Sequence, residues 1–126
     1  MKCITIKDKD YVLKFTSKVI SELNLKNITM TTLSKDMEEM KMNNLYYVFW
    51  QGLRFKNKNI TLDDAYEIID EYFEEDEENT TEDFFMLVLE EYSRAMGLGK
   101  NFKTIKEEMN KNKQQQVIEV QAREVE

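Results

Sequence analysis

The start of the chain alternates between apolar and polar side chains, which predicts a β-hairpin. Ile4 and Ile6 share one side of the run 3–6, and the same period of two continues over residues 11–15. Such alternation is typical of strands with one buried face, and the polar residues 7–10 between the two runs predict the turn. Because an isolated hairpin is only marginally stable in water, we expect its apolar face to pack against helices.

From about residue 17 the apolar spacing changes to steps of three and four, the period of amphipathic helices. This spacing predicts four helices, over residues 17–25, 34–55, 62–75 and about 81–96. The stretch 24–32 lacks the period and is rich in Asn and Thr, so we expect a loop there. The fold class that follows is α+β and mainly α, with the N-terminal hairpin packed on a small bundle of about four helices.

Capping residues support several of these boundaries. Ser34 is in position to cap the long second helix, and Thr61 with Asp64 three residues later forms a short version of the capping box. Gly97 is a natural residue for the end of the last helix. Gly52 lies inside the second helical pattern, where glycine costs roughly 1 kcal/mol relative to alanine. We therefore expect a close helix crossing or the start of helix termination at Gly52.

The length of 126 residues fits one domain, and we place its compact part at residues 1–98. Residues 99–126 are expected to hold a short helix and a flexible tail that is mobile from about residue 111. Thr104, with Glu107 at the third helical position, is the expected cap of that helix. The apolar residues assigned to this helix are Phe102, Ile105 and Met109. Docking of the last ten residues on a partner or a neighbouring subunit is the alternative to a frayed tail.

The residue types of common active sites are missing from the sequence. The chain has no histidine, one cysteine and three glycines, so it offers no Ser–His or Cys–His pair and no glycine-rich phosphate loop. Cys3 falls in a predicted strand, which favours a structural role. The acidic run from Asp70 to Glu78 does not fit an EF-hand, because its sixth position is Glu75 and its twelfth is Thr81. We expect a protein without catalytic activity, metal or cofactor.

Charge is distributed unevenly along the chain. Residues 1–60 carry a net charge of +5, residues 63–83 contain twelve acids and no base, and residues 84–126 have no net charge. An acidic belt of this size opposes the counterion release that drives nucleic-acid binding, so nucleic acid is not expected as a partner. The chain also lacks a run of about 18 apolar residues and a secretory signal, which predicts no membrane contact and a cytoplasmic location.

A continuous apolar run at residues 45–50 exceeds what one core-facing stripe can hold. As a helix, LYYVFW would be apolar around most of its circumference. Core packing accounts for most of these side chains, and a surface for a partner or for weak self-association accounts for the rest, since tyrosine and tryptophan are enriched at interfaces. The residues predicted to contribute to that surface are Tyr46, Tyr47 and Trp50, with Met37 and Met40 as adaptable neighbours.

Two stretches carry a resemblance to a known family. Residues 49–75, FWQGLRFKNKNITLDDAYEIIDEYFEE, combine an apolar helix, a GLR turn and the phrase ITLDDAYEIIDE, and residues 4–24, ITIKDKDYVLKFTSKVISELN, run from a hairpin into a helix. Both stretches resemble the tail assembly chaperones of long-tailed, siphovirus-type bacteriophages and prophages, over Ile4 to Leu98. Asp8 and Lys9 stand where that family's hairpin has a turn with glycine.

The resemblance implies a protein that acts by binding. In that family the chaperone coats the long tape measure protein, helps recruit tail tube subunits and is absent from the mature virion. A longer product made by translational frameshifting is common, and its added C-terminal part contacts the tape measure protein while the shared part recruits tube protein. The expected location is the cytoplasm of the bacterial host.

Two other functions are compatible with the sequence. A non-catalytic adaptor that binds one peptide helix in a groove would share each physical feature above, and a stable one-to-one complex with a host protein would identify it. A small hydrolase with a carboxylate site is the enzymatic alternative, because pairs of acids can always be found among 25 acidic residues. Turnover that a single Asp or Glu substitution abolishes would identify such a hydrolase.

Overall fold

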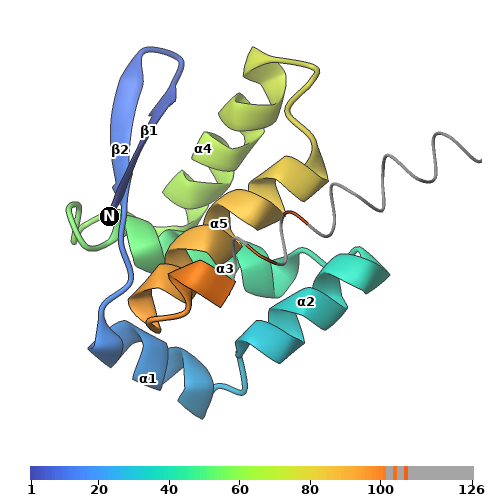
Figure 1. The fold of residues 1–126 in the computed structure, drawn as a ribbon. Coiled ribbons are helices and arrows are strands. Elements are labelled where there is room, and N and C mark those ends of the chain that lie inside the picture. Colours follow the sequence, from blue (N-terminus) through green and yellow to red (C-terminus); the bar gives the residue numbers. More distant parts are fainter. Residues whose placement is uncertain (102–103, 105–106, 108–126) are drawn as a thin grey trace, which may run out of the picture.

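A hairpin of two strands precedes five helices in the computed structural model, which describes residues 1–101, 104 and 107 (Figure 1). The elements are β1 (Lys2–Ile6), β2 (Lys9–Leu13), α1 (Ser17–Leu25), α2 (Met30–Glu39), α3 (Asn43–Leu53), α4 (Leu62–Glu75) and α5 (Thr81–Ala95). In Figure 1 the hairpin and α4 occupy the upper part of the view, α1 and α2 lie along the lower edge, and α3 and α5 lie between them. The predicted fold class, α+β and mainly α with an N-terminal hairpin, is confirmed.

The hairpin closes through a two-residue turn without glycine. β1 and β2 pair antiparallel, and Ile6 and Lys9 form the last pair before the turn. Lys7 and Asp8 both have positive φ, 47° and 65°, as a type I′ turn requires. The backbone N–H of Lys7 donates to the Glu75 carboxylate at the end of α4 (3.1 Å). This contact holds a strained turn against the helices, so the missing glycine does not prevent the hairpin.

The predicted helix over residues 34–55 is wrong, because two helices occupy this stretch. α2 ends at Met40, whose φ of 58° is left-handed, and the backbone N–H of Lys41 donates to the Asp36 carbonyl (2.8 Å) to close the helix. The Asp36 carboxylate is buried and accepts a hydrogen bond from Asn44 Nδ2 (2.8 Å) in the first turn of α3. This bond ties the end of α2 to the start of α3.

α2 also begins earlier than the sequence indicates. The Thr29 hydroxyl accepts a hydrogen bond from the backbone N–H of Thr32 (3.2 Å), as an N-cap does. Ser34 therefore lies inside α2 and does not cap a helix. Part of the Thr-rich stretch at 24–32 forms a helix start, since the same side chains that favour loops also favour N-caps.

Gly52 marks the place where the hairpin meets α3. The backbone N–H of Lys14, directly after β2, donates to the Gly52 carbonyl (3.2 Å). A Cβ on Gly52 would overlap Leu13 Cδ1 and would lie 2.9 Å from two ring carbons of Phe15. A close approach at Gly52 is confirmed, but its partner is the hairpin segment and not a second helix.

An aromatic cluster joins α3, α4 and α5. Phe84 is buried, and its ring lies 5.1 Å from that of Phe49, 5.7 Å from Tyr72 and 5.9 Å from Phe73 between centroids. The next residue along α5 is Phe85. Both are buried because α5 packs against α3 on one side and α2 on another.

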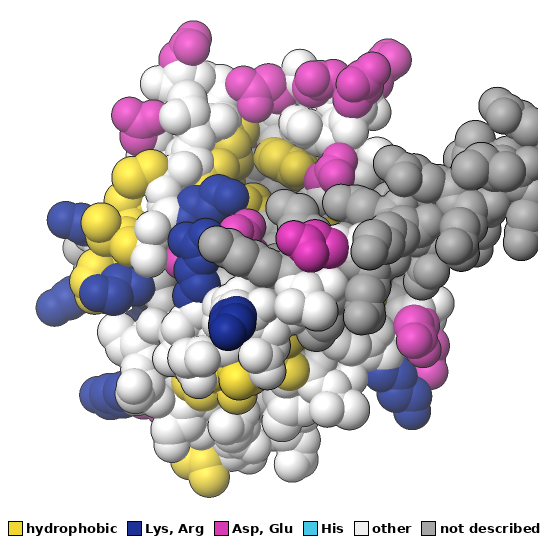
Figure 2. Space-filling view, in the orientation of Figure 1, with side chains coloured by type: hydrophobic (Ala, Val, Ile, Leu, Met, Phe, Trp, Pro, Cys, Tyr) yellow, Lys and Arg dark blue, Asp and Glu magenta, His cyan; other side chains and the backbone are white. Residues whose placement is uncertain are grey.

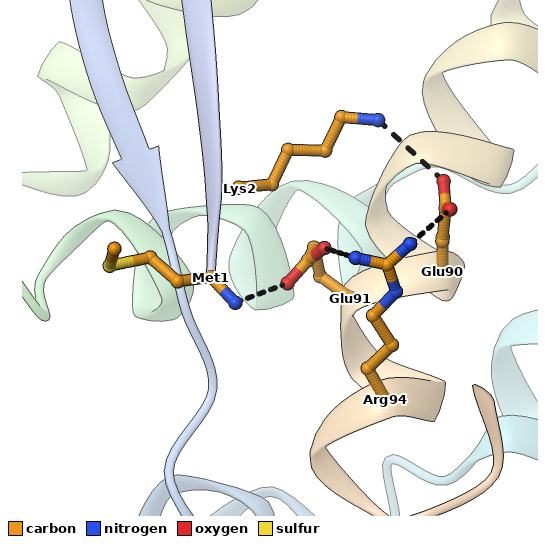
Figure 3. Close-up of polar contacts among 5 residues, drawn as sticks. All are labelled: Met1, Lys2, Glu90, Glu91 and Arg94. Atoms are coloured by element: carbon orange, nitrogen blue, oxygen red, sulfur yellow. Dashed lines mark hydrogen bonds and ion pairs between the residues drawn. The ribbon is translucent and has the colours of Figure 1, made fainter.

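A charged network connects the start of the hairpin to α5 (Figure 3). The Met1 ammonium lies 3.0 Å from Glu91 Oε2, and the Glu91 side chain is only 1% exposed. Arg94 reaches both Glu91 (3.4 Å) and Glu90 (3.0 Å), and Lys2 approaches Glu90 (3.6 Å). The buried carboxylate therefore has two cationic partners that remain about half exposed.

The predicted cap at Thr61 and the predicted helix end at Gly97 are confirmed. Thr61 and Asp64 form a complete capping box at the start of α4, with bonds of 3.1 and 3.0 Å. The hydrogen bond that the Thr61 backbone N–H donates to the Asp64 carboxylate is the main cause that lowers the pKa of Asp64. Thr80 opens α5 with a second capping box, and Gly97 follows α5 with a φ of 77°. Thr61 and Gly97 thus have the predicted roles.

The predicted cap at Thr104 is wrong. Gly99–Asn101 and Thr104 are helical, and the Thr104 hydroxyl donates to the Lys100 carbonyl (3.3 Å), so Thr104 lies within a helical segment. Residues 102–103, 105–106 and 108–126, with the predictions made for them, lie outside the described residues. Within the described part, no helix has the length and apolar character to cross a membrane.

Candidate functional site

A groove lies between the C-terminal end of α2 and the N-terminal end of α5. Its volume is about 540 Å³, and its lining consists of Met37, Glu38 and Met40 from α2 with Thr80, Thr81, Glu82 and Phe85 from α5. We call it the methionine groove. Phe85 is fully buried at 0% exposure, Met37 is half-buried, and Met40 is 64% exposed. The groove therefore has an apolar floor and one accessible apolar side chain at its edge.

The antiparallel packing of α2 and α5 positions this groove. At the far end of the pair, the Ser93 hydroxyl of α5 lies 3.7 Å from the Met30 sulfur of α2. At the near end, the left-handed Met40 ends α2, and the Thr80 cap starts α5. Phe85 lies just over one turn into α5, which brings it to the floor between the two helix ends.

Tyr46 lies in a different hollow, between α3 and α4. This hollow has a volume of about 310 Å³ and is lined by Asn43, Tyr46, Tyr66, Ile69 and Asp70. The rings of Tyr46 and Tyr66 meet edge to face, with centroids 6.1 Å apart. Burial raises the pKa of Tyr46, and the nearby Asp70 carboxylate adds to the effect. Tyr66 is 40% exposed.

Tyr47 faces α1 on another side of α3. Lys26 Nζ lies 5.4 Å from the centre of the Tyr47 ring, and Gln51 Nε2 donates to its hydroxyl (3.0 Å). A hollow of about 250 Å³ lies between Tyr47 and α1, and Leu25, another residue of its lining, is 82% exposed. Tyr47 and Tyr46 therefore contribute to separate surfaces, although they are adjacent in sequence.

Trp50 has a structural contact that occupies its only polar atom. Its indole Nε1 donates to the Ile60 carbonyl (2.9 Å), which fastens the connection between α3 and α4. The Tyr47 ring lies 5.5 Å from it, and the Arg54 guanidinium stacks 5.0 Å from its ring centre. These contacts account for the half-buried position of Trp50 within the fold.

The structure thus brings Met37 and Met40 together but separates them from the three aromatic residues predicted to share their surface. Sequence reasoning missed Glu38, Thr81 and Glu82 as lining residues of the groove. The only available signal was the Thr80 capping box, which shows where α5 begins but not which element faces it.

Acidic side chains gather beside the methionine groove. Figure 2 shows Asp and Glu along the upper rim of the molecule, above most of the Lys and Arg side chains on this face. The acidic residues 74–78, which end α4 and begin the α4–α5 connection, are exposed and lead directly into Thr80 and Glu82 of the groove. Lys7 Nζ pairs with Glu74 at 3.2 Å. The groove accordingly lies next to a negative surface.

Among residues 1–101, 104 and 107, no three or more Cys, Asp or Glu side chains are grouped so that they could hold a metal ion. Cys3 is exposed on β1. The chain matches no protein-family model, no curated protein and no solved structure.

Proposed function

We propose that this protein is a phage tail assembly chaperone that binds a helical segment of the tape measure protein and helps recruit tail tube subunits. The resemblance of residues 4–98 to that family supports the identity of the clients. The methionine groove supports the mode of binding, and it is the observation that carries the proposal. The chaperone acts in the bacterial cytoplasm and leaves before the virion is complete.

The lining of the groove suits a helix as its occupant. Helices dock in apolar grooves through side chains spaced three and four residues apart, and methionine adapts to clients whose side chains vary along their length. Met37 and Phe85 form an apolar floor, and Met40 extends over the edge with 64% of its surface exposed. A long client with many similar helical segments needs such a tolerant contact.

The negative surface favours a client with basic residues beside its apolar stripe. The exposed acids at 74–78 lie next in sequence to the groove, and charge complementarity of this kind raises association rates and orients the partner. The same charges keep a loaded complex dissolved. Weak self-association along the client is part of the proposal.

Binding to tape measure fragments with one substituted groove residue is the direct test. We expect Met40→Lys to weaken binding of purified fragments by at least ten-fold, because it places a charge in an apolar contact. Leu25→Lys is the matched control, since it also adds one charge at an exposed apolar residue but lies on α1, away from the groove. Wild-type protein that binds no fragment would refute the proposal. A stable one-to-one complex with a host protein instead would favour the adaptor function.

A further inference from the structure

A hollow between α3 and α4 combines two tyrosine rings with a carboxylate. Its lining consists of Asn43, Tyr46, Tyr66, Ile69 and Asp70, and we call it the tyrosine hollow. Tyr66 and Asp70 are four residues apart on α4, so they share one face of that helix. Asn43 and Tyr46 are three residues apart on α3 and likewise share a face. Because α3 and α4 pack against each other, the two faces meet at the hollow.

The two tyrosine rings enclose a corner instead of stacking flat on each other. The centroids of Tyr46 and Tyr66 lie 6.1 Å apart, with 72° between the ring planes. Tyr66 is 40% exposed, whereas Ile69, which also lines the hollow, is buried. The volume of about 310 Å³ lies at the small end of ligand pockets, which span roughly 300–1,000 Å³. A space of this size suits one long side chain.

The polar groups of the hollow have unused hydrogen-bonding capacity in the described part of the chain. Asp70 is exposed, and within residues 1–101, 104 and 107 its carboxylate has neither an ion pair nor a hydrogen bond. The hydroxyls of Tyr46 and Tyr66 also have no hydrogen-bond partner among these residues. Burial, and after it the Asp70 carboxylate, raises the pKa of Tyr46, so the negative charge acts on that ring.

This combination of groups is complementary to a cationic side chain. A cation is attracted to the face of an aromatic ring within about 6 Å of its centroid, and the carboxylate supplies the opposite charge. α4 contains no basic residue, so the helix that carries Asp70 offers no cation of its own. Arginine fits better than lysine, because its guanidinium is planar and weakly hydrated, stacks on aromatic rings and can donate two parallel N–H bonds to a carboxylate.

The arginines in the described part of this chain already have partners. The Arg54 guanidinium lies 5.0 Å from the centre of the Trp50 ring, and Arg94 pairs with Glu90 at 3.0 Å. A second copy of the chain would have to give up one of these contacts to place Arg54 or Arg94 in the hollow. The arginine that fits the hollow therefore comes from a different protein.

We propose that the tyrosine hollow binds an arginine side chain of a partner protein. The guanidinium lies in the corner between Tyr46 and Tyr66 and donates to the Asp70 carboxylate. The site is separate from the methionine groove, which α2 and α5 line, and its existence does not depend on the chaperone function. Loss of tape measure binding would leave the arginine site standing, and an empty tyrosine hollow would leave the proposed function standing.

Titration of the unaltered, full-length protein with N-acetyl-arginine methylamide tests the site. In NMR spectra we expect the ring protons of Tyr46 and Tyr66 to shift with saturation at concentrations on the order of millimolar. The citrulline analogue, which has nearly the same shape without the charge, should bind at least about five-fold more weakly, and the lysine analogue about three-fold more weakly. Shifts that do not saturate, or equal affinities for the arginine probe and either analogue, would overturn the proposal. Ring shifts that follow protein concentration and not arginine would assign the hollow to contacts between copies and would overturn it equally.

Variants with matched controls locate the binding in the hollow. Asp70→Asn should weaken binding of the arginine probe about five-fold, and Tyr66→Leu about three-fold. Both side chains are exposed, so the fold should persist, which the amide spectrum verifies. Glu67→Gln removes the same charge from an exposed position of α4 outside the hollow, and Phe55→Leu removes a ring of similar exposure (39%) elsewhere. Both controls should keep the wild-type affinity. An equal loss in Asp70→Asn and Glu67→Gln would show a general effect of negative charge and would contradict a built site.

Discussion

Replacing Gly52 with alanine should destabilise the protein, although the same change stabilises most helices. Alanine is ordinarily better than glycine inside a helix by about 0.5–1 kcal/mol. In this fold the new Cβ would overlap Leu13 Cδ1 and lie 2.9 Å from two ring carbons of Phe15. The steric conflict therefore opposes the gain in helix propensity.

The burial of its neighbours sets the size of this effect. Leu13 is 0% exposed and Phe15 is 4% exposed, so neither side chain can move toward solvent without disturbing the core. The hydrogen bond from Lys14 N–H to the Gly52 carbonyl (3.2 Å) also holds the two backbones together. Overpacking of a core costs about 1–3 kcal/mol. After the helix-propensity gain is subtracted, we expect Gly52→Ala to lower the free energy of unfolding by about 1–2 kcal/mol.

Urea unfolding followed by the fluorescence of Trp50, the only tryptophan, is a suitable assay. Gly99→Ala is the control for composition, because among the described residues its Cβ would meet Arg94 Cγ at an ordinary 3.4 Å, and we expect a change within about 0.5 kcal/mol. Gly97→Ala separates backbone strain from packing, since φ is 77° and no atom in the described part of the chain lies within 4 Å of the new Cβ. We expect that variant to lose about 1 kcal/mol. A Gly52→Ala protein as stable as wild type, with an unchanged slope, would show that the hairpin does not approach α3 this closely.

Three further predictions concern the polar contacts of the fold. Glu91→Gln removes a buried carboxylate that lies 3.0 Å from the Met1 ammonium. Because the cations around this carboxylate are half exposed, we expect the free energy of unfolding measured in urea to fall by about 1–2 kcal/mol, and by less at high salt. Thr61→Ala removes the N-cap of α4 and should cost about 1 kcal/mol. The depressed pKa of Asp64 means that its contribution to stability is complete above the ordinary aspartate pKa and is lost as the pH falls through the lowered one. Because the backbone N–H of residue 61 is the main cause, Asp64→Asn and not Thr61→Ala should flatten the acid decline of the urea midpoint. Burial raises the pKa of Tyr92, so the unfolded state loses this proton first and stability should fall as the pH rises above about 10. Tyr92→Phe should show a shallower alkaline decline in the same titration, and an unchanged decline would contradict the assignment.

The elements with local signals could be predicted from the sequence. The capping box of Thr61 and Asp64 and the left-handed Gly97 are formed by residues within a few positions of one another, so the pattern contains all the necessary information. The alternation at residues 3–15 likewise predicted the hairpin, because the side facing the helices must be apolar. The turn at Lys7 and Asp8 has no such signal, since its support comes from the end of α4.

The break between α2 and α3 could not be predicted, because a contact between side chains decides it. No glycine or proline occurs at residues 39–44, and the apolar spacing continues across them as in one helix. The buried Asp36 carboxylate and its bond from Asn44 (2.8 Å) favour two helices, and Met40 adopts a left-handed conformation that sequence statistics reserve mostly for glycine or asparagine. The periodicity of apolar residues carries no information about a hydrogen bond between two polar side chains.

The same break explains why the predicted partner surface separated into three places. In one continuous helix Met40 and Tyr47 would lie seven residues apart on the same side, about two turns from each other. The left-handed turn at Met40 redirects the chain, so that Met37 and Met40 lie opposite Phe85 of α5 while Tyr46 and Tyr47 lie against α4 and α1. A groove between two helix ends therefore replaces a flat aromatic surface.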